Sequence, residues 1–213
     1  MLKIWGRANS MNVQKAMWAV GELGIPHERI DAGGKFGGLD TPQYVAMNPN
    51  KRIPTIDDGG VIVWESGAVV RYLAARYGSG SLWPADAGER ARADQWMDWK
   101  QTTLSPPLTV VFMGLVRTAA DKRNQAAIDA AAVELGALYG LVDKQLQGRK
   151  FIAGDQLTIG DIPVGATCYR YFTLPIKRPA LPNLEAWYKR LQERPAYRQH
   201  VMVSYEDLRA PGA

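Results

Sequence analysis

Two short segments, residues 48–56 (NPNKRIPTI) and 64–68 (WESGA), combine a proline in a predicted strand with polar side chains at a predicted helix start. An Xaa-Pro bond beside a site can be cis, which turns the N–H and C=O of the preceding residue, here Ile53, toward a ligand. Ser66 opens the helix, where free N–H groups and the positive dipole end bind a carboxylate. Glu65 beside it can accept hydrogen bonds from an ammonium. Together they suit a zwitterionic amino-acid head group.

The residues around these segments predict alternating strands and helices as far as residue 78. Val13, Ala16, Met17 and Val20 recur at spacings of three and four, which is typical of a helix with one buried face. The turn at residues 58–60 (DGG) indicates a hairpin. In chain order the predicted elements are strand 2–8, helix 13–24, strand 27–31, strands 53–57 and 61–64, and helix 65–77.

Beyond residue 78 the pattern changes to helices alone. Residues 78–81 (GSGS) followed by Pro84 predict a linker. Thr158 and Asp161 have capping-box spacing, with Asp161 in place of the usual Glu or Gln. The predicted helices are 89–103, 107–119, 125–147, 159–174 and 183–194. We therefore expect an α/β domain over 1–78, a linker over 79–86 and an all-α domain over 87–213.

The composition is that of an ordinary globular protein, with 46% hydrophobic and 22% charged residues. Cys168 is the single cysteine, so no internal disulfide is expected, and we expect a cytoplasmic location. No uninterrupted apolar stretch reaches the roughly 20 residues of a membrane span. The net charge of +5 is spread over both halves, which argues against a nucleic-acid track. His27 and His200 stand alone, so no metal site is expected.

In order and spacing these motifs resemble those of the cytosolic glutathione transferases. The resemblance extends to residues 181–187 (LPNLEAW) and to Arg194-Pro195 near the end of the chain. It implies an α/β N-terminal thioredoxin-like domain followed by an all-α C-terminal helical domain. It also implies glutathione as co-substrate, a small hydrophobic electrophile as second substrate, and a homodimer.

The resemblance assigns a glutathione-binding role to residues of the two opening segments. These residues are Lys51, Arg52, Ile53, Pro54, Glu65 and Ser66. Ile53 would pair with the cysteinyl backbone, while Glu65 and Ser66 would hold the γ-glutamyl end. Lys51 would lie near the glycine carboxylate, and Arg52 would either aid that charge or point to solvent. Taken alone, Ser66 is better explained by ordinary helix capping, and only the combination with the other residues favours ligand binding.

The activating residue of the family lies between the first strand and the first helix, here residues 7–12 (RANSMN). Ser10 aligns with the hydroxyl residue of the classes that use serine or threonine. In a bacterial, nu-like class similar to this chain, an asparagine follows two positions later, as Asn12 does. Both would donate hydrogen bonds to the glutathione sulfur and favour the reactive thiolate. The alternative for both residues is helix capping.

The leading hypothesis is a detoxifying glutathione S-transferase that conjugates the glutathione thiolate to apolar electrophiles. A glutathione-dependent disulfide or peroxide reductase is the alternative, because the same bacterial class is associated with that activity. A non-catalytic ligand-binding protein of the same fold is the third, and intact Ser10, Lys51, Glu65 and Ser66 argue against it. The sequence does not identify the electrophile, since the apolar faces of the predicted helices after residue 87 have no distinctive composition.

Overall fold

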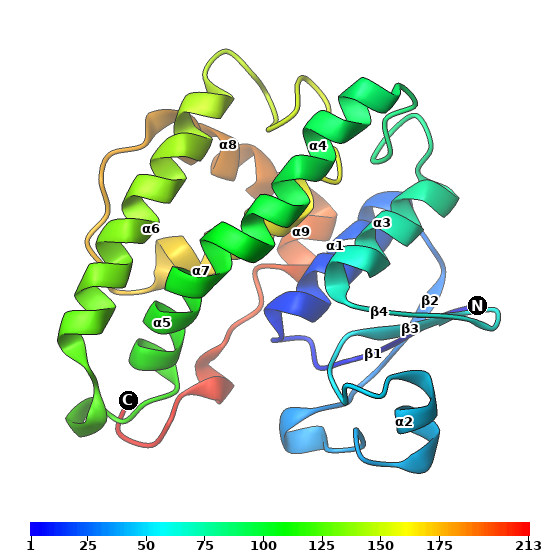
Figure 1. Ribbon diagram of the computed structural model, residues 1–213, viewed down its shortest axis with the longest axis horizontal. Helices are drawn as coiled ribbons and strands as arrows, with labels where there is room; N and C mark the ends of the chain where they lie inside the picture. Colours follow the sequence, from blue (N-terminus) through cyan, green and yellow to red (C-terminus); the bar gives the residue numbers. More distant parts are fainter. The chain divides into compact units, whose positions relative to one another are not determined.

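The computed structural model describes residues 1–213, and their contacts divide the chain into two compact units. The first unit contains Met1–Arg90 and Arg194–Val203, and the second contains Ala91–Glu193 and Ser204–Ala213. All four strands belong to the first unit, and the second is helical (Figure 1). The predicted fold class, an α/β domain followed by a helical one, is confirmed.

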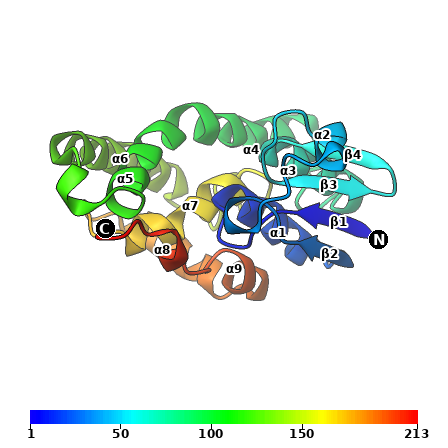
Figure 2. The ribbon, with the colours of Figure 1, turned by 90° about the horizontal axis from the view of Figure 1, so that it is seen from below.

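The first unit is built on a four-stranded mixed sheet in the order β2-β1-β3-β4 (Figure 2). Its strands are β1 (Leu2–Trp5), β2 (His27–Ile30), β3 (Thr55–Asp58) and β4 (Val61–Trp64). β1 pairs parallel with β2 and antiparallel with β3, which pairs antiparallel with β4. Two predicted strands were too long, because residues 6–8 and 53–54 lie outside the ladder. Trp5 and Thr55 are paired, so both of these segments leave the sheet at the same end of the strands.

Two longer helices, α1 (Met11–Leu23) and α3 (Ser66–Tyr77), lie on one side of this sheet, and α2 (Pro42–Met47) lies on the other (Figure 1). α1 ends as predicted at Gly24, whose φ of 62° is left-handed. α2 was not predicted. It has only six residues, too few for a periodic pattern, although Thr41 caps its start and Pro42 occupies its first turn.

A second short helix, α9 (Pro195–His200), was also missed by the sequence pattern, and it packs against α1 in the first unit. Tyr197 makes an edge-on contact with Trp18, with ring centroids 4.8 Å apart. The Arg194 guanidinium donates to Glu22 Oε1 at 2.7 Å. These contacts join segments more than 170 residues apart in the sequence, which explains why no local pattern revealed them.

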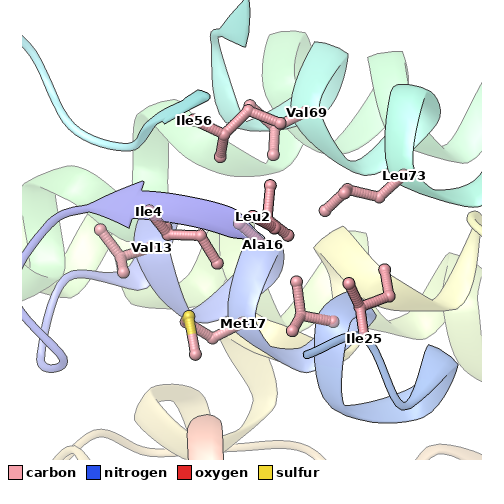
Figure 3. Close-up of a cluster of buried hydrophobic side chains, with 10 residues drawn as sticks. Leu2, Ile4, Val13, Ala16, Met17, Ile25, Ile56, Val69 and Leu73 are labelled. Atoms are coloured by element: carbon pink, nitrogen blue, oxygen red, sulfur yellow. The ribbon is translucent and has the colours of Figure 1, made fainter. Parts of the chain in front are cut away.

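The core of the first unit lies between the sheet and the helices α1 and α3. Figure 3 shows its apolar side chains meeting there: Leu2, Ile4, Val13, Ala16, Met17, Ile25, Ile56, Val69 and Leu73. Complete burial of one such Leu, Ile or Val side chain contributes about 1.5–3 kcal/mol. The cluster thereby holds the start of α1, the start of α3 and strand β3 in fixed relation, and most residues of the candidate site lie at the two helix starts or in the segment just before β3.

The rest of the chain forms longer helices, namely α4 (Ala87–Trp99), α5 (Ser105–Val116), α6 (Gln125–Leu146), α7 (Asp161–Thr173) and α8 (Pro182–Gln192). A π-helical turn over Lys100–Leu104 joins α4 to α5, so the break predicted between residues 103 and 107 is absent. The capping motif is present: Asp161 Oδ2 accepts from Thr158 N at 2.9 Å, and Oδ1 accepts from Ile152 N at 2.9 Å. Asp161 thus anchors the start of α7.

Helix α6 is the one helix that is long and apolar enough, by length and composition, to cross a membrane. Charged residues interrupt the apolar stretches of α6, so no uninterrupted apolar run marks it in the sequence. α6 contacts α5 and α8, and it buries Leu135, Tyr139 and Val142. Core helices of soluble proteins meet the same criteria.

Candidate functional site

The residues predicted from the sequence come together in one pocket of about 440 Å³ in the first unit. They are Ser10, Asn12, Lys51, Arg52, Ile53, Pro54, Glu65 and Ser66, and none lies elsewhere. The pocket lies at the end of the sheet where the two interior strands, β1 and β3, respectively end and begin. Sequence reasoning missed the other lining residues, Arg7, Gly33, Gly34, Leu39 and Asn48.

Ser10 precedes α1 with the extended backbone of an N-cap residue, φ −84° and ψ 120°. Its C=O accepts from Gln14 N at 2.9 Å, as an N-cap carbonyl should, yet its side chain makes no capping hydrogen bond. The Ser10 hydroxyl therefore has no partner within the protein and lines the pocket. Because α1 begins here, the positive end of its dipole is directed at the same place.

Asn12 lies in the first turn of α1, and its side chain connects the two helix starts. Its Oδ1 accepts a long hydrogen bond, 3.4 Å, from Ser66 Oγ. The Asn12 amide nitrogen makes no hydrogen bond within the protein and remains a donor on the pocket wall. The start of α1 thus presents a hydroxyl and an amide donor, which is the chemistry that stabilises an anion.

Ile53 lines the pocket, and its backbone N–H and C=O are available to a ligand. The Ile53–Pro54 peptide bond is cis, as the sequence suggested. Because β3 begins at Thr55, the N–H and C=O of Ile53 take no part in the ladder, and neither makes another hydrogen bond within the protein. Unpaired backbone groups of this kind can pair with an extended peptide, as an added strand would.

Glu65 and Ser66 form the opposite end of the pocket. Glu65 has φ 67°, a left-handed conformation that is uncommon for a residue other than glycine and is concentrated at functional sites. Its exposed carboxylate has no partner. Ser66 is buried and opens the 12-residue helix α3, whose first N–H groups lack intrahelical acceptors. A carboxylate beside an N-terminal helix end can bind an ammonium and a carboxylate together.

The pocket carries more positive than negative charge. Lys51 Nζ lies 3.0 Å from Asp40 Oδ1, but both side chains are at least half exposed, so this pair contributes little and leaves Lys51 available to a ligand. Arg52 is exposed without a side-chain partner, and Arg7 lines the same wall. Against these three cations stands the single carboxylate of Glu65. The balance favours an anionic ligand.

Gly33 and Gly34 bring the loop after β2 close to the pocket. Their φ values, 77° and 60°, lie in the left-handed region that favours glycine. A Cβ atom on Gly33 would come within 3.2 Å of Ile53 Cδ1 and 3.3 Å of Leu39 Cδ1. The glycines that predicted only a flexible loop therefore allow a close approach to Ile53. They are far from the predicted site residues in the sequence, so no local pattern linked them to the pocket.

A family model described as "Glutathione S-transferase, N-terminal domain" matches residues 1–75, and the corresponding C-terminal domain model matches residues 93–195. The chain is 44% identical to glutathione S-transferase GstB of Escherichia coli K12 over 205 residues, which is 95% of this chain and 99% of the relative.

Solved structures agree with these matches. A theta class glutathione S-transferase from Xanthomonas axonopodis pv. citri, crystallised with glutathione bound, superposes with a TM-score of 0.91 at 46% identity, covering 95% of this chain and 98% of that one. The Bombyx mori transferase BmGSTD1 superposes with a TM-score of 0.86 at 27% identity, covering 97% and 95% of the two chains. The pocket at the end of the sheet carries unpaired hydrogen-bond donors, and two domain models and these relatives match the chain. Together these findings show that the chain belongs to the glutathione S-transferase family.

Proposed function

We propose that this protein conjugates glutathione to small apolar electrophiles and that Ser10 and Asn12 activate the thiol. The observation that carries the proposal is the unpartnered Ser10 hydroxyl at the start of α1. A hydroxyl and an amide donor beside the positive end of a helix stabilise a thiolate relative to a thiol. Glutathione is bound in the similar Xanthomonas structure, which supports glutathione as the ligand of this pocket.

Glutathione fits the polarity of the pocket from one end to the other. The Glu65 carboxylate and the N–H groups at Ser66 suit the ammonium and carboxylate of its γ-glutamyl end. The unpaired backbone of Ile53, held before Pro54, suits the cysteinyl peptide group. Lys51, supported by Arg52, suits the glycine carboxylate.

When bound, glutathione supplies a thiolate whose sulfur bonds to an electrophilic carbon while the leaving group departs with its electron pair. The residues of this chain bind and orient glutathione, and they favour the loss of its thiol proton to solvent. Ser10 and Asn12 hold the sulfur anionic by hydrogen bonding, and the segment around Ile53 fixes its position. Lowering the thiol pKa and positioning the thiolate are thus the catalytic contributions.

The assembly and the location of the protein form part of the same proposal. As domains along the sequence, distinct from the two compact units, we assign residues 1–78 to glutathione binding, 79–86 to the linker and 87–213 to the helical domain. A homodimer is supported by the edge strand β4, where Val61, Ile62 and Trp64 are between 37% and 47% exposed. The buried cysteine Cys168 suits a reducing cytoplasm.

Parallel turnover assays test the proposed reaction. One assay follows conjugation of an aryl halide, and the other follows reduction of a small mixed disulfide, both with glutathione present. Faster turnover of the aryl halide supports conjugation, and turnover of the disulfide alone assigns the protein to glutathione-dependent reduction. Binding of glutathione without turnover in either assay would identify a non-catalytic member of the family.

A further inference from the structure

Three buried polar side chains lie at or behind the pocket wall, and the proposed mechanism makes no use of them: Asn48 lines the pocket, whereas Tyr44 and Thr55 do not. Tyr44 belongs to α2, Asn48 follows α2, and Thr55 opens β3, and they are 3%, 1% and 0% exposed. Buried polar groups are costly unless they are hydrogen-bonded. The partners of these three side chains therefore show what the cluster does.

The cluster converges on one backbone atom, the carbonyl oxygen of Arg52. Tyr44 Oη donates to it at 2.6 Å, and Asn48 Nδ2 donates to it at 3.0 Å. Thr55 Oγ1 lies 2.9 Å from Tyr44 Oη and 3.0 Å from Asn48 Nδ2, so the three side chains also bind one another. Burial raises the pKa of the Tyr44 phenol further above its ordinary, already alkaline value.

The same cluster holds the start of the loop. Asn48 Oδ1 accepts from Asn50 N at 3.0 Å, and Asn48 C=O accepts from Lys51 N at 3.1 Å. Lys51 itself has a left-handed φ of 54°. The backbone of residues 50–52 is thus tied down from its buried side, while the side chains of Lys51 and Arg52 and the peptide groups of Ile53 face the pocket.

We infer that Tyr44, Asn48 and Thr55 are positioning residues that preset the loop of residues 50–53 for glutathione by clamping the Arg52 carbonyl. This inference rests on the proposed function. A loop held in its binding conformation before the ligand arrives loses less conformational entropy on binding. The cluster acts on affinity for glutathione rather than on ionisation of its thiol, since Ser10 and Asn12 belong to a different element.

Tyr44→Phe removes one hydroxyl and keeps the ring, so it tests the clamp directly. The KM for glutathione should rise about three- to tenfold, the range expected for one lost hydrogen bond, while kcat at saturating glutathione and the pKa of the bound thiol stay unchanged. Tyr72→Phe is the matched control, because Tyr72 Oη donates at 2.8 Å to Asp58 Oδ2 in the same unit, and Tyr72 does not line the pocket. Its KM should equal that of the unaltered protein.

Thr55 supplies a second test that does not depend on the tyrosine. Thr55→Ser keeps the hydroxyl and should preserve the KM, whereas the isosteric Thr55→Val removes it and should raise the KM. A folded Tyr44→Phe protein with the original KM overturns the inference about the clamp and leaves the proposed function standing. A Tyr72→Phe protein whose KM rises equally has the same consequence. Failure of the unaltered protein to bind glutathione overturns the proposed function instead.

Discussion

Ser10→Ala separates the two roles that a serine at a helix start can have. A capping serine replaced by alanine costs about 1 kcal/mol of stability. The Ser10 side chain makes no capping bond, so its removal should change the free energy of unfolding by less than about 0.5 kcal/mol. If the hydroxyl instead serves a bound thiolate, the loss should appear only in the complex with glutathione.

The expected size of that loss follows from the strength of a hydrogen bond to a charged group. Such a bond contributes about 1.5–3 kcal/mol, and one pKa unit corresponds to about 1.4 kcal/mol. The pKa of the bound thiol should therefore rise by roughly one to two units in Ser10→Ala. Turnover well below that pKa should fall about 10- to 100-fold, while affinity for protonated glutathione changes only a few fold. Asn12→Ala should shift the profile in the same direction, and the double variant should lose less than the product of the singles.

The thiolate can be followed by its ultraviolet absorbance while the binary complex is titrated. Asn124→Ala is the matched control, because Asn124 Oδ1 does cap α6, accepting from Ala127 N at 3.0 Å. That variant should lose stability and keep the thiol pKa, the opposite of Ser10→Ala. An unchanged thiol pKa in both Ser10→Ala and Asn12→Ala, with glutathione still bound, would remove these residues from the mechanism.

Further predictions concern the end of the pocket formed by Glu65 and Ser66, and the stability of each unit. Glu65→Ala and Ser66→Ala should each weaken glutathione binding more than about tenfold by calorimetry, and retained affinity in both would refute the site. Asp161→Asn replaces one of the two accepting oxygens by an NH2 donor, so the backbone N–H of either Ile152 or Thr158 loses its acceptor. Chemical denaturation should then show the free energy of unfolding lowered by about 1–3 kcal/mol, and equal stability would contradict this. Burial lowers the pKa of His200, with His27 adding to the effect, so the unfolded chain binds a proton at higher pH. Stability should thus fall as pH drops below the ordinary histidine range, less so in His200→Gln; identical pH slopes would refute it.

Local sequence patterns predicted much of the framework for physical reasons that are themselves local. The apolar spacing in α1 and the turn between β3 and β4 depend on neighbouring residues, so they could be recognised without the fold. Proline and glycine indicated the cis bond at Pro54 and the end of α1. The six-residue helices α2 and α9 were missed because fewer than two turns show no period.

The sequence alone indicated which residue types would meet in the pocket, because polar residues at a strand end and at helix starts have chemical meaning wherever they occur. It could not show that the Ser10 hydroxyl lacks a capping partner, that Gly33 approaches Ile53, or that Tyr44 reaches the Arg52 carbonyl. Each of these facts depends on where the chain is held by distant contacts, such as the pairing of β1 with β3 and the core beneath α1 and α3. Such contacts arise from packing in three dimensions, which a local pattern does not contain.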